Sequence, residues 1–324
     1  MKEFERIKMY IQEATTICLA SHIHADGDAV GSIGAMYHFL KAIGKEVYMV
    51  MPNLGDRFSF LPAIEERVES VPLNNYDLLI CLDTSNMERL NIADKDINKA
   101  KNIVVVDHHI NNTIEADAKY VCEQAPANCE IIYDLITFMN HNITNDIAEY
   151  IYMGIMTDTG SFNYERTSSK THKIAGEMID AGADYVRTCK ILNHTNSEIR
   201  MKLVAKTIND MESYMDGKVR IGVIDRKTIE QFDAKEQDLD SLVTYLRCIE
   251  NTIVAIYFRA LEDGTYKVSI RAEEPVEASA LSMEFGGGGH KRAAGFSTDD
   301  VDDTKFKLLK ILERLLKSEN NGNT

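Results

Sequence analysis

Three consecutive residues, Asp107, His108 and His109, directly follow the apolar run at residues 103–106. One carboxylate and two imidazoles can bind a divalent metal ion or contact a phosphate group. The β-branched run before them predicts a buried strand, and α/β enzymes place their sites at the carboxyl ends of strands. Alone, the three residues could be an accident of the surface, so other segments of the chain must decide.

A second group of candidate ligands, His22, Asp26 and Asp28, lies between a predicted strand and a predicted helix. Gly27 separates the two acids and lets the backbone turn sharply, so that the carboxylates can point at different ions. One of the acids is also expected to cap the helix. A cap alone does not account for an imidazole together with two carboxylates, and this favours a metal site.

Two further carboxylates follow apolar segments. Asp83 comes directly after a predicted strand at residues 78–82, where an isolated acid would most simply cap the next turn. Asp158 ends a predicted helix at residues 147–156, although the negative end of a helix dipole disfavours a carboxylate there. A bound cation would compensate for that charge, so both residues join the candidate ligands.

The combined set offers two imidazoles and four carboxylates, enough for two divalent ions that share one carboxylate. Mixed ligands of this kind favour Mn²⁺ or Co²⁺, and Mg²⁺ is possible although it prefers oxygen ligands. No cysteine lies in these motifs, so no soft ligand favours structural zinc. Two such ions about 3.5–4 Å apart are the usual equipment for in-line attack on phosphorus. The predicted ligands are His22, Asp26, Asp28, Asp83, His108 and Asp158.

The elements that must position these ligands alternate between strands and helices in the first half of the chain. Such alternation predicts an α/β fold with a doubly wound, mainly parallel sheet, which we assign to residues 1–185. The predicted strands lie at residues 16–21, 46–51, 78–82 and 103–106, and the predicted helices at 30–43, 128–138, 147–156 and 171–181.

The second half of the chain predicts a helical linker at residues 186–215 and a smaller α+β domain at residues 216–318. Apolar residues at helical spacing predict one amphipathic helix over residues 197–214 within that linker. The remaining predictions are strands at residues 219–224, 253–258 and 266–270, a closing helix at 304–316 and a disordered tail at 319–324.

Composition limits the class of partner. The formal net charge of −15 argues against a groove for long duplex nucleic acid, because such grooves neutralise many phosphates with Lys and Arg. Short oligonucleotides and mononucleotides remain possible. The six cysteines form no C-x-x-C pair and are expected to be reduced thiols. With no signal peptide and no apolar run of membrane length, we expect a cytoplasmic protein that does not enter membranes.

Taken together, these motifs resemble those of the DHH phosphoesterase superfamily. The first motif matches His22, Asp26 and Asp28, the second Asp83, the third Asp107-His108-His109 and the fourth Asp158. The resemblance implies one ion held by His22, Asp26 and Asp83 and another held by Asp28, Asp83, His108 and Asp158, with Asp83 as the bridge. It also implies that Asp107 orients the imidazole of His108 and that His109 faces the scissile phosphate. Asp83, Asp107 and His109 are therefore the expected catalytic residues.

Residues 285–296 contain four glycines followed by His290 and resemble the GGGH motif of the DHH-associated nucleotide-binding domain. Glycines let backbone N–H groups approach an anion closely, and a guanidinium can bind a phosphate with two hydrogen bonds. Lys291 and Arg292 either add positive charge there or are simply solvated. The expected substrate-binding residues are Arg271, Gly287, Gly288, Gly289 and His290.

The order of the two domains resembles the stand-alone subgroup of nanoRNases that also dephosphorylate 3'-phosphoadenosine 5'-phosphate. This resemblance implies a Mn²⁺-dependent enzyme that hydrolyses very short RNA to 5'-mononucleotides, and 3'-phosphoadenosine 5'-phosphate to AMP and phosphate. A homodimer is compatible with the family. One alternative is a phosphodiesterase for signalling dinucleotides such as pApA, pGpG or cyclic di-AMP. Another is a non-catalytic nucleotide sensor, which is disfavoured because none of the six ligands is missing.

Overall fold

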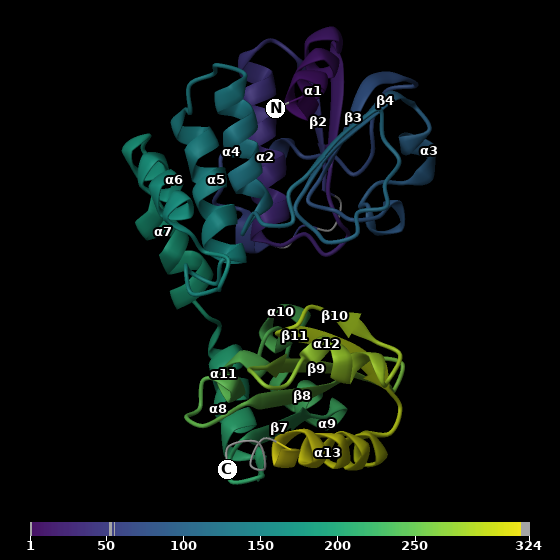
Figure 1. Cartoon of the computed structure of the whole chain (residues 1–324), viewed down its shortest axis with the longest axis vertical. Coiled ribbons are helices and arrows are strands. Elements are labelled where there is room, and N and C mark those ends of the chain that lie inside the picture. The colour runs from purple at the N-terminus through teal and green to yellow at the C-terminus, as the bar shows by residue number, and fades with distance from the viewer. Residues whose placement is uncertain (1, 52–53, 55, 319–324) are drawn as a thin grey trace. The chain divides into compact units, whose positions relative to one another are not determined.

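The computed structural model describes residues 2–51, 54 and 56–318, and their contacts divide the chain into two units (Figure 1). The first unit ends at His194 and the second begins at Thr195. This division leaves no separate linker at residues 186–215, because the helices in that range pack into one unit or the other. The predicted tail at residues 319–324 lies outside the described residues.

The first unit is built on a five-stranded parallel sheet in the order β2-β1-β3-β4-β5. The predicted α/β fold with a parallel sheet is confirmed. The edge strand β5 escaped prediction because its four residues, Ala-Lys-Tyr-Val, form no apolar run. The strands are β1 (Thr16–Ala20), β2 (Glu46–Val50), β3 (Tyr76–Leu82), β4 (Ala100–Asp107) and β5 (Ala118–Val121).

Helices cover one face of this sheet, and loops with short helical turns cover the other. Helices α1, α2, α4 and α5 contribute to the large apolar core on the first face (Figure 1). On the second face the packing residues include Val71, Leu90 and Ile114. The helices are α1 (Lys2–Glu13), α2 (Gly27–Ala42), α3 (Asp94–Ile97), α4 (Asn128–Phe138), α5 (Asn145–Asp158), α6 (Ser169–Asp180) and α7 (Tyr185–Cys189). Short helical turns lie at Asp56–Phe58, Ile64–Glu66, Met87–Arg89 and Lys190–His194.

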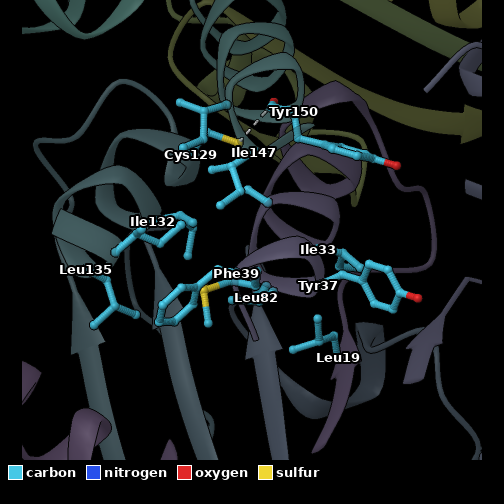
Figure 2. Packing of buried hydrophobic residues seen from close by; sticks show 14 of the residues in the cluster. Leu19, Ile33, Tyr37, Phe39, Leu82, Cys129, Ile132, Leu135, Ile147 and Tyr150 are labelled. Carbon is cyan, nitrogen blue, oxygen red and sulfur yellow. Dashed lines mark hydrogen bonds between the residues drawn. The ribbon is translucent and has the colours of Figure 1, made fainter. Parts of the chain in front are cut away.

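Helices α2 and α5 approach closely because α2 presents glycine to the fully buried Tyr150. A Cβ atom added at Gly34 would lie 2.0 Å from the Tyr150 ring, so no larger residue fits without movement. Figure 2 shows Tyr150 of α5 and Ile33 and Tyr37 of α2 in this core. At the other end of the contact, Gly27 packs against Thr157. The start of α2 therefore lies beside the end of α5, which brings two predicted ligand positions together.

The second unit is built on a six-stranded sheet in the order β10-β11-β9-β8-β7-β6. Strands β7 and β8 pair in parallel, and the other neighbouring pairs are antiparallel. Helices α12 and α13 pack on one face and α8 to α11 on the other, as expected for a smaller α+β domain. The strands are β6 (Glu212–Tyr214), β7 (Val219–Ile224), β8 (Val254–Ala260), β9 (Tyr266–Ala272), β10 (Gly288–Gly289) and β11 (Ala293–Thr298). The helices are α8 (Glu198–Asn209), α9 (Arg226–Phe232), α10 (Glu236–Leu239), α11 (Val243–Arg247), α12 (Ala278–Met283) and α13 (Val301–Ser318).

The predicted single helix over residues 197–214 is wrong. Helix α8 ends at Asn209, and Glu212–Tyr214 forms the edge strand β6, which pairs with β7 through a tight hairpin. Asp216 and Gly217 in that turn both have positive φ, as the Asp-Gly pair of a hairpin commonly does. This pair was the available sequence signal for a hairpin, and the continued helical spacing of apolar residues obscured it.

Candidate metal centre

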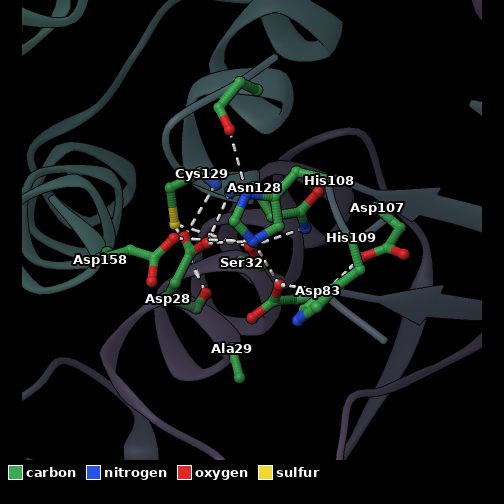
Figure 3. A network of polar contacts seen from close by, with 12 residues as sticks. Asp28, Ala29, Ser32, Asp83, Asp107, His108, His109, Asn128, Cys129 and Asp158 are labelled. Carbon is green, nitrogen blue, oxygen red and sulfur yellow. Dashed lines mark hydrogen bonds and ion pairs between the residues drawn. The ribbon is translucent and has the colours of Figure 1, made fainter. Parts of the chain in front are cut away.

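The predicted ligands of the first unit gather at the carboxyl edge of the parallel sheet. His22 lies just beyond β1, Asp83 directly follows β3, and Asp107 is the last residue of β4. Because parallel strands end at the same edge, these side chains converge, and Figure 3 shows Asp83 and Asp107 among them. The start of α2 and the end of α5 add Asp28 and Asp158 to the same place.

One group of ligand atoms surrounds the imidazole of His22. Its Nε2 lies 3.7 Å from Asp83 Oδ2 and 3.9 Å from Asp26 Oδ1. Asp26 also caps α2, because its Oδ1 accepts hydrogen bonds from the N–H groups of Asp28 (3.0 Å) and Ala29 (3.1 Å). The same carboxylate therefore serves as a helix cap and as a candidate ligand.

A second group surrounds the imidazole of His108. Its Nε2 lies 3.3 Å from Asp83 Oδ1, 3.6 Å from Asp158 Oδ2 and 3.8 Å from Asp28 Oδ2. The two oxygens of Asp83 thus face two different groups of ligand atoms. This is the arrangement expected of one carboxylate shared by two ions, and the structure brings all six predicted ligands into it.

The donor set fits divalent ions. Within the described residues, Asp83 Oδ1 is buried and has no hydrogen bond of normal geometry. The separations of 3.3–3.9 Å in both groups are long for hydrogen bonds. They match ligands that each lie about 2.1 Å from a shared ion, which places such ligands about 3 to 4.2 Å apart. An ion in the group around His108 would satisfy this oxygen, which faces that group.

The electrostatics of the centre also favour cations. Burial acts to lower the pKa of His108, but a hydrogen bond and the charges of Asp83, Asp28 and Asp158 raise it to about 11. Burial and the neighbouring charge of Asp83 raise the pKa of Asp28 to about 7. The buried carboxylates therefore stabilise positive charge at the position of the His108 imidazole, and divalent cations would supply such charge.

Asp28 is fixed by the beginning of α4. Its carboxylate accepts hydrogen bonds from the backbone N–H groups of Asn128 (2.5 Å) and Cys129 (2.9 Å). The positive end of a helix stabilises a carboxylate in this position. The Asn128 side chain donates to Ser32 Oγ at 2.9 Å and ties α4 to α2 (Figure 3). Sequence reasoning missed this contact, because it joins residues about a hundred positions apart.

The expectation that Asp107 orients His108 is wrong. Asp107 Oδ1 instead accepts a hydrogen bond from Nδ1 of His109 at 2.8 Å, and His108 Nδ1 is held by the carbonyl of Ala125 at 3.1 Å. Strand β4 ends at Asp107, and the chain beyond it brings the ring of His109 back to this carboxylate. Asp107 therefore orients the imidazole of His109, which is expected to face substrate. The other carboxylate oxygen of Asp107, Oδ2, accepts a hydrogen bond from Asn112, a residue that the sequence did not single out.

The predicted substrate-binding residues of the second unit lie at one end of its sheet. Strand β10 contains Gly288 and Gly289, and a tight turn from His290 to Ala293 connects it to β11. Arg271, near the end of β9, pairs in register with Ala293. The structure therefore places the backbone of Arg271 beside the glycine hairpin.

The glycines of this hairpin differ in what surrounds them. A Cβ atom at Gly287 would lie 2.4 Å from Gly295 O and from Ser282 Oγ, and Gly289 has a φ of +139°. Both positions require glycine for the fold itself. Nothing lies within 4 Å of a Cβ atom added at Gly288, which is exposed. Among the described residues, packing does not require glycine at position 288. The missing side chain instead leaves room for a ligand.

The basic residues after His290 form ion pairs. Lys291 Nζ lies 3.4 Å from a carboxylate oxygen of Glu277 and 3.5 Å from one of Glu274. The Arg292 guanidinium pairs with Glu274 at 3.3 Å and with Glu273 at 3.7 Å. Local glutamates therefore balance both charges, and neither residue adds net positive charge beside the hairpin.

Comparison with known proteins assigns the family. The model of the DHH family, N-terminal domain, matches residues 16–155, and the model of the DHHA1 domain matches residues 216–318. The chain therefore belongs to the DHH family. It is a phosphoesterase with both domains, and its ligand set indicates dependence on divalent metal ions.

Relatives match over most of their length. The bifunctional oligoribonuclease and PAP phosphatase NrnA of Thermus thermophilus is 29% identical over 290 residues, covering 88% of this chain and 85% of the relative. The protein of the same name from Bacillus subtilis is 29% identical over 310 residues, covering 93% and 95%. An exopolyphosphatase-related protein from Bacteroides fragilis shares the fold, with a TM-score of 0.89, 24% identity and coverage of 98% and 96%. None of the helices in the described ranges has the length and apolar character needed to cross a bilayer.

Proposed function

We propose that the protein hydrolyses very short RNA oligonucleotides to 5'-mononucleotides and releases phosphate from 3'-phosphoadenosine 5'-phosphate, with Mn²⁺ as the preferred ion. Asp83 carries this proposal, because its two oxygens face two separate groups of ligand atoms. The relatives from Thermus thermophilus and Bacillus subtilis, whose names describe both activities, support this choice of substrates.

Six residues would hold two divalent ions, His22, Asp26 and Asp83 on one side and Asp28, Asp83, His108 and Asp158 on the other. Bound ions would activate water and stabilise the charge of the phosphoryl oxygens. The mixture of imidazole and carboxylate donors supports Mn²⁺ over Mg²⁺, which prefers a shell of oxygens.

His109 is the proposed contact to the scissile phosphate. Its Nδ1 donates to Asp107, so the opposite ring atom, Nε2, is directed away from that carboxylate. An imidazole held in this way stabilises charge that develops on a phosphoryl oxygen, because it does not have to reorient during the reaction. Asp107 would then act by fixing the tautomer and the direction of the ring.

In the second unit, we assign substrate binding to Arg271, Gly287, Gly288, Gly289 and His290. The exposed backbone of Gly288 allows close approach of a base or a phosphate. Arg271 supplies a guanidinium suited to a second phosphate. Short substrates are favoured because the paired charges of Lys291 and Arg292 offer little attraction to a longer backbone.

The test is a substrate panel with purified protein and Mn²⁺, Co²⁺ or Mg²⁺. The panel contains 5'-phosphorylated RNA of two to five nucleotides, a 24-nucleotide RNA, 3'-phosphoadenosine 5'-phosphate, pApA, pGpG and cyclic di-AMP. We expect the highest kcat/KM on the shortest RNA, release of phosphate from 3'-phosphoadenosine 5'-phosphate, and the highest rates with Mn²⁺.

Asp83→Ala is the matched variant, because it removes a ligand from both groups at once. We expect it to lose at least about 10³-fold in kcat on every substrate. A preference for signalling dinucleotides over short RNA would replace the proposed substrate. Inactivity of the wild-type protein with every ion and substrate would support a nucleotide sensor instead.

A further inference from the structure

Asn112 lies in the loop after β4 and uses all the hydrogen-bonding groups of its side-chain amide. Its Nδ2 donates to Asp107 Oδ2 at 2.6 Å and to the carbonyl of Thr84 at 2.8 Å. Its Oδ1 accepts a hydrogen bond from the N–H of Ile114 at 3.0 Å. One half-buried amide thus connects the residues that follow β3 with the last residue of β4.

The bond to Thr84 matters because the preceding residue, Asp83, has a φ of +52°. A residue with a side chain adopts this left-handed conformation at an energetic cost, although Asp tolerates it better than most. The N–H of Asp83 donates a hydrogen bond to Val106 O at 3.1 Å. The carbonyl of the following residue, Thr84, accepts a hydrogen bond from Asn112 Nδ2. The two bonds hold the backbone on either side of the shared carboxylate, whose oxygens must reach both ligand groups.

The hydrogen bond from Asn112 to Asp107 affects a second residue of the site, His109. Asp107 is fully buried and shares its two oxygens between His109 Nδ1 and Asn112 Nδ2. Without Asn112, one oxygen of a buried carboxylate would lose its donor, and the carboxylate could rotate away from His109. The direction of the His109 ring therefore depends on Asn112 through Asp107.

We propose that Asn112 is a positioning residue that fixes two groups of the site at once: the shared carboxylate of Asp83 through the carbonyl of Thr84, and the imidazole of His109 through Asp107. The inference rests on the proposed phosphoesterase function and deepens it. Asn112 is not one of the candidate ligands, and it acts by the two hydrogen bonds that its NH₂ group donates.

Two variants and one control test this role. Asn112→Ala removes the amide, and Asn112→Asp keeps its size but replaces the NH₂ donor with an oxygen. The control is Thr113→Val, because Thr113 Oγ1 bonds Ser85 O at 3.3 Å in the same loop and contacts no ligand of the centre. Measurements are kcat and KM on a 5'-phosphorylated RNA dinucleotide, Mn²⁺ affinity by calorimetry, and the melting temperature.

We expect both Asn112 variants to lose about 10- to 100-fold in kcat and to bind Mn²⁺ at least about tenfold more weakly. KM should change by less than about threefold, because the substrate contacts assigned to the second unit remain and His109 acts mainly on charge that develops in the transition state. Asn112→Asp should be at least as impaired as Asn112→Ala, because its carboxylate faces Asp107 and a carbonyl oxygen. Thr113→Val should keep kcat and Mn²⁺ affinity within about twofold of the wild type.

Wild-type kcat and Mn²⁺ affinity in Asn112→Asp would overturn the proposal. So would an equal loss in Thr113→Val, which would reduce the effect to loop stability. If Asn112→Ala is too unstable to assay, the isosteric Asn112→Asp decides. If the wild-type enzyme hydrolyses none of the substrates, the proposed function fails. Calorimetry can still test whether Asn112 positions the carboxylate of Asp83. Equal Mn²⁺ affinity in the wild type and in Asn112→Asp would show that it does not.

Discussion

The two adjacent histidines after β4 have different surroundings, which predicts different losses on mutation. His108 Nε2 lies among three carboxylates, whereas His109 is held by Asp107. His108→Ala should weaken Mn²⁺ binding by at least about tenfold. His109→Ala should retain Mn²⁺ binding and lose about 10²- to 10³-fold in kcat, the usual loss for a group that stabilises transition-state charge. Calorimetry and steady-state kinetics on the same preparations would show the reverse pattern if the two roles were exchanged.

Neighbouring glycines of the GGGH hairpin allow a matched comparison. Gly288→Ala places a methyl group in open space, so the melting temperature should stay within about 2 °C of the wild type while KM rises at least about fivefold. Gly287→Ala drives a Cβ atom against Gly295 O and should destabilise the second unit by about 1–3 kcal/mol. Thermal melts and kinetics separate the effects. An unchanged KM in Gly288→Ala would remove this glycine from the proposed substrate contacts.

The ligands themselves could be found in the sequence because they lie at the boundaries of predicted strands and helices, which the apolar runs make easy to recognise. Their supporting contacts could not be found in that way. The bond between Asp28 and the start of α4 joins residues about a hundred positions apart, and no local pattern encodes it. Asn112 looks like an ordinary turn residue until β3 and β4 are placed side by side. The error over Asp107 arose at the end of β4, where the strand pattern no longer indicates which of the two histidines its carboxylate contacts.

At the scale of elements, Asp77 links the beginnings of β1 and β3. Its Oδ2 accepts hydrogen bonds from the N–H groups of Thr15 (2.8 Å) and Thr16 (3.0 Å), and these bonds lower its pKa below the usual 3.8. Asp77→Ala should lower the stability of the first unit by about 1 kcal/mol at pH 7.

The pH dependence of that difference follows from the direction of the shift. Because the folded pKa of Asp77 lies below the unfolded one, its contribution is complete above the unfolded pKa and disappears as the pH falls through the folded value. Urea unfolding of the wild type and Asp77→Ala should therefore show a difference that is constant from pH 7 to about pH 5 and shrinks below about pH 4. A difference that grows on acidification would contradict this role.

Elements with strong apolar patterns were predicted almost to the residue, and weak edge elements were not. Helix α4 and strand β7 have the predicted bounds. Strands β10 and β11 were missed because glycine and alanine dominate them, and such residues carry little strand propensity. Strand β11 pairs with β9 and β10 pairs with β11, and only the assembled sheet provides these contacts.

At the scale of the whole molecule, each unit has its own apolar core, so the two should unfold separately. All the candidate metal ligands precede His194. Calorimetric scans should show two transitions, and Mn²⁺ at 100 times its Kd should stabilise only the first unit, by about 2.7 kcal/mol.

The assignment of the transitions can be checked with Asp83→Ala, in which neither transition should respond to Mn²⁺. Gly287→Ala should shift only the transition that is insensitive to Mn²⁺, because its clash lies in the second unit. One cooperative transition that shifts as a whole with Mn²⁺ would show that the units do not unfold independently.

The division at His194 also affects how the protein can evolve. Every group assigned to the metal chemistry, together with its supports Asp107, Asn112 and Asn128, is inherited in one continuous stretch of the gene, and the residues proposed to recognise substrate are inherited in another. Recombination or rapid change in the second stretch can therefore alter which phosphate ester is chosen without dismantling the hydrolytic machinery. The same boundary gives protein engineers a natural point at which to exchange recognition modules.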